Sequence, residues 1–149
     1  MTSPDTAPDF RIEFRSNAFD TRDALAALDA FLAKARVAAD ERGTIELAMA
    51  EVCNNVVEHA YPDGSAGQIR LSCRNGGRGV EIELRDDGAP MPDGRVPVGS
   101  PPDLGVAEED LPEGGFGWFL IRELVREISY ARQDGQNVLR LHFDLNTDR

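Results

Sequence analysis

Residues 68–85, QIRLSCRNGGRGVEIELR, contain a clear pattern of two strands and a turn. Apolar residues alternate with polar ones on both sides of the triplet Asn75-Gly76-Gly77. Such alternation predicts two half-buried strands, over residues 68–74 and 80–85. Because Asn and Gly tolerate positive φ, the triplet predicts a hairpin turn. The two strands are therefore expected to be sequential neighbours in one sheet, with no helix between them.

Helical periodicity appears on both sides of this hairpin. Leu25, Leu28 and Leu32 recur at helical spacing after a potential cap at residue 20 or 21, which predicts a first helix ending at Gly43. A second helix is predicted from about residue 44 until Pro62 stops it. A third is predicted over residues 118–128.

Three further strands complete the predicted order. Alternation predicts a strand over residues 10–15, and a final hairpin joins residues 129–132 to residues 138–143. Strands linked by hairpins, with helices that must cover one sheet face, predict an α+β fold: a two-layer α/β sandwich with a mixed, mostly antiparallel sheet. A doubly wound parallel sheet would need a helix between every pair of strands, which the sequence lacks.

Length and composition limit the possible functions. The 149 residues fit one domain, expected over residues 10–149 after a flexible tail at residues 1–9. The formal net charge of −11 argues against a nucleic-acid partner. Lys34 is the only lysine, which excludes a Walker-type phosphate loop.

The apolar stretches and the cysteines suggest a location. No run approaches about 18 consecutive apolar residues, so neither a membrane span nor a standard export signal is expected. Cys53 and Cys73 show no metal-ligand spacing and are expected to be buried, reduced thiols. A cytoplasmic location is the resulting expectation.

The second predicted helix carries an unusual polar face. Apolar residues lie on one side, and the other side carries Glu51, Asn54, Asn55, Glu58 and His59. Asn is a poor interior helix residue because its short amide competes for the backbone. Two adjacent asparagines beside a carboxylate therefore suggest an oxygen ligand for a hard cation. A merely solvated face remains the alternative, and a structural His59 is favoured over a catalytic one.

Two glycine motifs follow. Asp86-Asp87-Gly88 ends a predicted strand, where it could form a simple turn or accept a hydrogen bond from a ligand amino group. Gly115-Phe116-Gly117 opens the third helix, where free backbone amides suit phosphate, although a plain loop hinge explains it as well. Together with the polar helix face, they describe a site for a magnesium-bound purine nucleotide.

These motifs resemble those of a known family. EVCNNVVEHAY, residues 51–61, is similar to the N box of the GHKL ATPases, and the two glycine motifs resemble its glycine boxes. The similarity extends from about residue 10 to residue 143. It is closest to the histidine-kinase-like, free-standing anti-sigma-factor serine/threonine kinases of bacterial partner-switching systems. The resemblance implies the Bergerat ATP-binding fold.

The resemblance also implies roles for individual residues. Asn55 would bind Mg²⁺, Glu51 would act as the catalytic carboxylate, and Asp86 would receive the adenine amino group of ATP. Gly88 would line the base pocket, while the residues of the second glycine box would wrap the phosphates: Gly115, Phe116 and Gly117. Residues 89–113 would form the ATP lid.

The function implied is a protein serine kinase that phosphorylates an anti-anti-sigma protein of the STAS type and sequesters a regulator such as a sigma factor. The family also implies a homodimer. The predicted lid carries one cation, Arg95, against Asp93, Asp103, Glu108, Glu109 and Asp110, with Glu113 at its end. An acidic lid favours an alternative, an ATP-binding regulatory module with little kinase activity. The catalytic half of a histidine kinase fits less well, because no upstream phosphoacceptor histidine precedes His59.

Overall fold

One five-stranded sheet forms the base of the molecule. The computed structural model describes residues 9–61, 67–76, 79–97 and 115–145. Its strands are β1 (Phe10–Arg15), β2 (Gln68–Asn75), β3 (Gly79–Asp86), β4 (Glu127–Gln133) and β5 (Gln136–Asp144), in the spatial order β1-β2-β3-β5-β4. Every pairing among these described strands is antiparallel, where the sequence allowed for a mixed sheet. The hairpin predicted from residues 68–85 is the β2–β3 pair.

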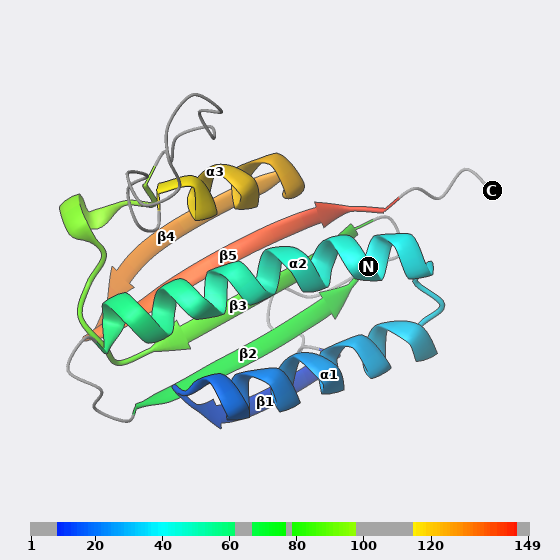
Figure 1. Ribbon diagram of the computed structural model, residues 1–149, viewed down its shortest axis with the longest axis horizontal. Coiled ribbons are helices and arrows are strands. Elements are labelled where there is room, and N and C mark those ends of the chain that lie inside the picture. The colour runs from blue at the N-terminus through cyan, green and yellow to red at the C-terminus, as the bar shows by residue number, and fades with distance from the viewer. Residues whose placement is uncertain (1–8, 62–66, 77–78, 98–114, 146–149) are drawn as a thin grey trace, which may run out of the picture.

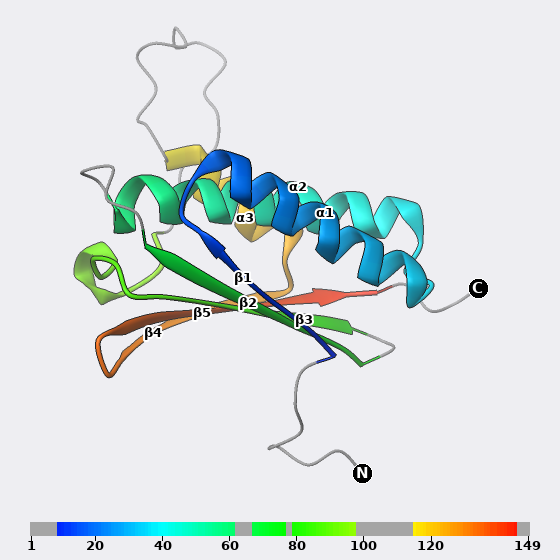
Figure 2. The ribbon, with the colours of Figure 1, turned by 90° about the horizontal axis from the view of Figure 1, so that it is seen from below.

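Three helices cover one face of this sheet. They are α1 (Ala18–Lys34), α2 (Ala39–Asn55), which continues into a π-helical turn η1 (Val56–Ala60), and α3 (Gly115–Leu124). Figures 1 and 2 show all of them on the same side, with α1 and α2 side by side and α3 over β4 and β5. The α+β two-layer prediction is therefore confirmed. Within the described ranges, no helix is both long and apolar enough to cross a bilayer.

The core lies between the two layers. Alternate residues of β2, β3 and β5 point toward the helices, and Ile69, Leu71, Ile82, Leu84 and Leu141 are each at most 1% exposed. They meet the apolar stripe of α2, which includes Ile45, Met49 and Val52. Full burial of such a side chain contributes about 1.5–3 kcal/mol. This packing fixes the rotation of α2 about its axis and therefore which of its polar residues face the site.

The helix boundaries correct three predictions. α1 ends at Lys34, not at Gly43, because Arg36 adopts a left-handed conformation (φ 68°) and reverses the chain. α2 then begins at Ala39, so Gly43 lies inside a helix. The cap of α1 is Asn17, whose side chain accepts a hydrogen bond from Asp20 N at 2.7 Å. The sequence pattern predicts a stop at a glycine, whereas the residue with the left-handed conformation is Arg36.

The C-terminal elements differ in their limits from the prediction. α3 ends at Leu124 and β4 already begins at Glu127, so Ile128 belongs to a strand. The final hairpin turns through Asp134 (φ 51°) and Gly135 (φ 79°), which makes it a tight two-residue loop between long strands. A short turn of this kind leaves Asn137 inside β5.

The sheet face without helices carries charged side chains. Glu83 on β3 forms ion pairs with Arg85 at 3.0 Å and with Arg140 of β5 at 3.6 Å. These pairs are partly exposed, so each contributes at most about 1 kcal/mol. The charged side chains of this face contact water, whereas the apolar core lies on the opposite face of the sheet.

The two cysteines lie in the protein core. Cys53 and Cys73 are free and buried, and burial raises the pKa of each thiol to about 12, as expected for unreactive core thiols.

Of the predicted tail, residues 1–8 lie outside the described ranges. Asp9 is described, and its carboxylate accepts a hydrogen bond from Asn75 N at 2.7 Å.

Candidate functional site

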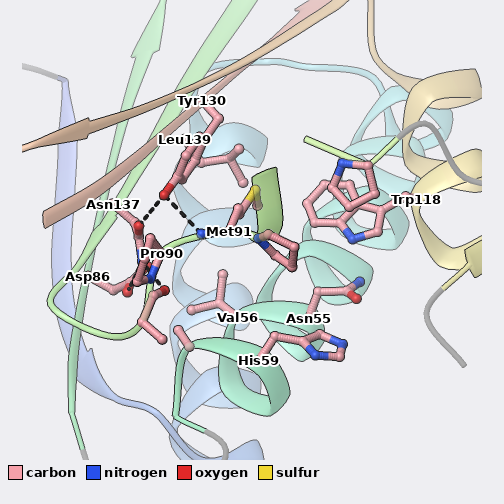
Figure 3. Close-up of a pocket in the computed structure, with 14 residues that line it drawn as sticks. Asn55, Val56, His59, Asp86, Pro90, Met91, Trp118, Tyr130, Asn137 and Leu139 are labelled. Carbon is pink, nitrogen blue, oxygen red and sulfur yellow. Dashed lines mark hydrogen bonds between the residues drawn. The ribbon is translucent and has the colours of Figure 1, made fainter. Parts of the chain in front are cut away.

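A cavity of about 230 Å³ lies between the helix layer and one end of the sheet. Its apolar walls include Val56, Met91, Trp118 and Leu139, and its polar groups include Asn55, His59, Asp86 and Asn137. Figure 3 shows Asp86 and Asn137 on one side, with Asn55, His59 and Trp118 on another. A mostly apolar cleft with a few convergent polar groups is typical of a small-molecule site.

Asp86, the last residue of β3, is the buried acid of this cavity. It is 3% exposed, and its Oδ1 accepts hydrogen bonds from Asn137 Nδ2 and from Gly88 N, both at 2.9 Å. Burial raises the pKa of Asp86, while these two hydrogen bonds and the charge of Arg132 lower it in part. Its Oδ2 accepts no hydrogen bond from the described part of the chain, so it is available to a ligand amino group.

A hydrogen-bond network supports Asp86 from the sheet. Asn137 on β5 lies opposite Asp86 in the β3–β5 register. The Oδ1 atom of Asn137 accepts from the hydroxyl of Tyr130 on β4, and that hydroxyl accepts from Met91 N at 3.0 Å. Sequence reasoning missed Asn137 and Tyr130. Asn137 adjoins a turn and reads as a loop residue, and its pairing with Asp86 is not a local property of the sequence.

Gly88 brings the turn after β3 against the end of η1. A Cβ atom built on Gly88 would lie 2.5 Å from Ala60 O, and Ala89 N donates to that same oxygen at 2.9 Å. Gly88 is therefore not a lining residue of the cavity. Its small size lets the strand end and the helix end form adjoining walls. Any direct contact with a base stays a prediction.

Glu51, Asn55 and Gly117 meet at another part of the site. A Cβ atom built on Gly117 would lie 3.2 Å from Glu51 Oε2 and 3.5 Å from Asn55 Nδ2. Asn55 is only 4% exposed, and its Nδ2 donates to Glu51 O at 2.8 Å, which leaves its Oδ1 as a potential ligand atom. The polar helix face and the second glycine motif therefore converge in space.

The first turn of α3 contains the second glycine motif. Within the described residues, α3 begins at Gly115, so Gly115, Phe116 and Gly117 are its first residues. Backbone N–H groups in a first helical turn have no partner within the helix and favour anions. Trp118, the next residue, lines the cavity. The motif thus places the backbone amide groups of the first described turn of α3 beside the site.

The polar face of the second helix is divided by the structure. Asn54 is exposed and lines a groove between α1 and α2, together with Thr21 and Leu47. Only Asn55 of the two asparagines reaches the cavity, because the core packing of α2 turns Asn55 inward and leaves Asn54 exposed. His59 lines the cavity and remains exposed. Asn54 therefore lies outside the cavity, whereas Asn55 lines it.

The donor set at this site suits a magnesium ion that is shared with a nucleotide. The described residues contain no cluster of three or more His, Cys, Asp and Glu able to hold a metal by themselves. Mg²⁺ rarely uses such a cage and is usually bound by one or two protein oxygens together with phosphates and water. The Asn55 carboxamide, with the Glu51 carboxylate nearby, fits that pattern.

The start of the predicted lid is part of the cavity wall. Of residues 89–113, only residues 89–97 are described, and Met91 and Pro97 line the cavity. Arg122 of α3 fixes this segment, because it donates to Val96 O at 3.1 Å and to Pro97 O at 3.0 Å. Arg95 is exposed and is not a lining residue. Among the described residues, no lysine or arginine lines the cavity.

The fold and the arrangement of the site are typical of a nucleotide-binding protein. Comparison with known families supports the same class. The family model of the histidine kinase-like ATPase domain matches residues 14–143. This chain belongs to that family, and the resemblance to GHKL ATPases is confirmed. The family in turn makes ATP the expected nucleotide of the cavity.

Two bacterial protein kinases are similar in sequence to this chain. The serine/threonine-protein kinase BtrW of Bordetella bronchiseptica is 34% identical over 130 residues, covering 87% of this chain and 89% of BtrW. The serine-protein kinase RsbW of Bacillus cereus is 33% identical over 102 residues, covering 67% of this chain and 62% of RsbW. The chain thus matches less than two thirds of that RsbW.

Two solved structures share the fold. The structure of the RsbU and RsbW domains of Rv1364c from Mycobacterium tuberculosis has a TM-score of 0.60 at 20% identity, over 94% of this chain and 33% of that one. The catalytic domain of histidine kinase ThkA has a TM-score of 0.52 at 16% identity, over 91% of this chain and 98% of that domain. At these identities the likeness concerns the fold alone.

Proposed function

We propose that this protein is an ATP-dependent protein serine/threonine kinase that phosphorylates an anti-anti-sigma protein of the STAS type. The observation that carries the proposal is that Asp86 and Asn55 line one cavity while Gly117 lies against Asn55 and Glu51 beside it, in a chain 34% identical to a kinase over most of its length. Three separate sequence motifs supply these residues. Their meeting at one place supports a nucleotide site rather than three unrelated turns.

The proposed binding mode follows from the chemistry of the walls. The adenine ring occupies the apolar part beside Val56, Met91 and Leu139, and Asp86 accepts a hydrogen bond from its amino group. The phosphates lie toward Gly117 and the first turn of α3, where free amide groups favour negative charge. Asn55 supplies a ligand oxygen to Mg²⁺, which would neutralise phosphate charge when bound.

Glu51 is the proposed catalytic residue. The serine hydroxyl of the partner attacks the γ-phosphorus in line; a new O–P bond forms as the bond to the β,γ-bridging oxygen breaks, and ADP leaves. Glu51 orients the hydroxyl and takes its proton. Its carboxylate lies beside Gly117, at the edge of the site where the phosphates are placed. Most of the acceleration then comes from positioning and charge neutralisation.

The wider biological role belongs to the same proposal. A kinase of this type sequesters a regulator such as a sigma factor when the unphosphorylated antagonist is scarce. It acts as a homodimer in the bacterial cytoplasm. These points rest on the family resemblance and on the similarity to RsbW.

An ATP-binding regulatory module without useful kinase activity is the second candidate. The specific observation that favours it is the absence of any lysine or arginine from the cavity walls formed by described residues. Phosphoryl transfer generally benefits from positive charge near the γ-phosphate. A module would need only the nucleotide and would use it to set the shape of a partner-binding surface.

Transfer of label separates the two candidates. The purified protein is incubated with Mg²⁺, γ-labelled ATP and a STAS-type protein from the same genome. We expect acid-stable phosphoserine on the STAS protein, and Glu51→Gln should lower the rate at least about 100-fold while ATP binding persists. Glu46→Gln, an exposed carboxylate on the same helix outside the cavity, serves as the control.

Three other outcomes of this experiment would lead to different conclusions. Tight ATP binding without transfer would support the regulatory module. Acid-labile phosphohistidine would instead indicate the histidine kinase reading. Failure to bind ATP at all would overturn the nucleotide site itself.

A further inference from the structure

Asn137 is held in a single orientation by four hydrogen bonds. Its Nδ2 donates to Asp86 Oδ1 at 2.9 Å and to Ala89 O at 2.8 Å. Its Oδ1 accepts from the Tyr130 hydroxyl and from Arg132 Nη1. Rotating the amide by 180° would place oxygen against two acceptors and nitrogen against two donors. A carboxamide that is 5% exposed and fully bonded cannot turn to suit a different ligand.

The fixed amide determines which atom of Asp86 is available. Asn137 and Gly88 N both donate to Oδ1, so that oxygen is occupied by the protein. Oδ2 receives no hydrogen bond from the described residues and is left as an acceptor. The site therefore presents one carboxylate oxygen with a defined direction, and it presents no donor from this residue while Asp86 is ionised.

The surroundings of Asp86 oppose the effect of burial on its charge. Burial raises the pKa of Asp86, and the neighbouring Asp87 carboxylate raises it further. The hydrogen bonds from Asn137 and Gly88 and the charge of Arg132 on β4 act in the other direction. The Tyr61 hydroxyl, at the end of η1, interacts with the same carboxylate. Among these groups, Asn137 is the uncharged side chain that bonds Asp86 directly.

We propose that Asn137 is a positioning residue that gives the site its preference for a 6-amino purine over a 6-oxo purine. The inference rests on the proposed ATP site and extends it to base specificity. An adenine amino group donates to Oδ2 of Asp86. The 6-oxo group of hypoxanthine or guanine would instead place an acceptor against an acceptor, which a rigidly held carboxylate cannot avoid.

The test compares ATP with inosine triphosphate, which differs from ATP at purine position 6. Dissociation constants are measured by titration calorimetry at fixed Mg²⁺ for the full chain. We expect the wild type to prefer ATP by about 10- to 100-fold, the range for a hydrogen bond to a charged group. Asn137→Asp keeps the shape but replaces the donor by an acceptor, so it should weaken ATP binding about 10-fold or more and collapse the preference.

A matched control lies one residue away on the same strand. Gln136 Nε2 donates to the exposed Asp87 Oδ1 at 2.9 Å, so Gln136→Glu makes the same amide-to-acid change against a neighbouring carboxylate outside the cavity. It should leave the ATP preference unchanged. A general electrostatic effect of one added negative charge would lower the preference in both variants and would overturn the inference.

The pH dependence of ATP affinity in Asn137→Asp distinguishes loss of the hydrogen-bond donor from loss of packing. In Asn137→Asp, two carboxyl groups face each other and can share one proton, which restores a donor toward Asp86. ATP affinity should therefore recover as the pH falls, although Asp86 itself accepts less well once protonated. Affinity that stays equally low across the pH range in a folded variant would contradict the role of the donor.

Tyr130→Phe keeps the inference testable if Asn137→Asp does not fold. It removes the hydroxyl that anchors Asn137 without burying a new charge. We expect a smaller fall in the ATP preference, about 3- to 10-fold. A wild type that binds neither nucleotide overturns the proposed function and this inference together. A wild type that prefers ATP, with variants that keep the full preference, overturns the inference alone.

Discussion

Gly117 has a role that depends on what its side chain lacks. It is the third residue of α3, and glycine loses more backbone freedom than alanine when a helix forms. The space beside it is taken by the Glu51 carboxylate and the Asn55 amide. A residue that weakens its own helix while leaving room for two polar groups is explained better by the site than by the fold.

Gly117→Ala tests this explanation. The new Cβ atom would lie 3.2 Å from Glu51 Oε2, so the carboxylate must move by a few tenths of an ångström. We expect unchanged or slightly increased stability in urea denaturation, but phosphoryl transfer reduced about 10-fold or more, since small misplacements are costly to catalysis.

Gly43→Ala is the matched control for that substitution. Gly43 lies in α2, and a Cβ atom there meets nothing within 4 Å. It should gain up to about 1 kcal/mol of stability with no change in activity. Equal activity of Gly117→Ala and Gly43→Ala would show that the space beside Gly117 is not needed.

Asp86 should make stability depend on pH. Burial raises its pKa in the folded state, so the folded protein binds its proton more tightly than the unfolded chain. The corresponding stability is present below the unfolded pKa and is lost as the pH rises through the folded pKa. Asp86→Asn should therefore be at least as stable as the wild type at neutral pH, with the difference shrinking on acidification.

Denaturation in urea at a series of pH values measures this effect, and calorimetry measures binding. The amide oxygen in Asp86→Asn can still accept from Asn137 and Gly88, but an N–H donor replaces the free acceptor. ATP affinity should fall about 10-fold or more while the fold is retained. A variant that is unstable at neutral pH would show that the Asp86 charge supports the fold.

At the level of elements, the site depends on contacts between the end of one element and the start of another. The end of η1 touches the turn after β3 at Gly88, and the Tyr61 hydroxyl accepts from Asp87 N at 3.1 Å just beyond it. A π-helical turn is uncommon and often marks a functional position. Here it ends the helix so that Val56, His59 and Ala60 all line the cavity.

Gly88→Ala should separate these elements. The added methyl group would lie 2.5 Å from Ala60 O, and that backbone atom cannot move freely. We expect a loss of about 1–3 kcal/mol in unfolding free energy together with weaker ATP binding. Gly76→Ala, in the turn after β2, meets its nearest atom at an ordinary 3.6 Å and should change neither quantity. Matching losses in both variants would point to a general effect of replacing turn glycines.

At the level of the whole molecule, local patterns predicted most of the fold and only part of the site. Alternation and turn chemistry in residues 68–85 predicted the β2–β3 hairpin, because both are properties of neighbouring residues. The pairing of β3 with β5 joins residues 51 positions apart, as Asp86 and Asn137 show. No local pattern encodes that distance, so the support of Asp86 by Asn137 could not be predicted.

The position of Asn54 outside the cavity also could not be predicted from a local pattern. A regular 100° step puts Asn54 and Asn55 on one broad face, but core packing of α2 turns Asn55 inward and leaves Asn54 exposed. The π-helical turn then changes the spacing of the residues that follow. Periodicity alone predicts a face to within about one residue, whereas binding depends on individual side chains.

The one-sided layering shown in Figure 2 separates two kinds of evolutionary change. Every described residue that lines the cavity lies in the helices, in the segment after β3 or on the helix-facing part of the sheet end, while the ion pairs of Glu83 lie on the opposite surface. Mutations among those outward charges can accumulate without changing a residue that lines the cavity. The nucleotide chemistry would be inherited intact, so paralogues in one genome could diverge in their associations while conserving the same reaction.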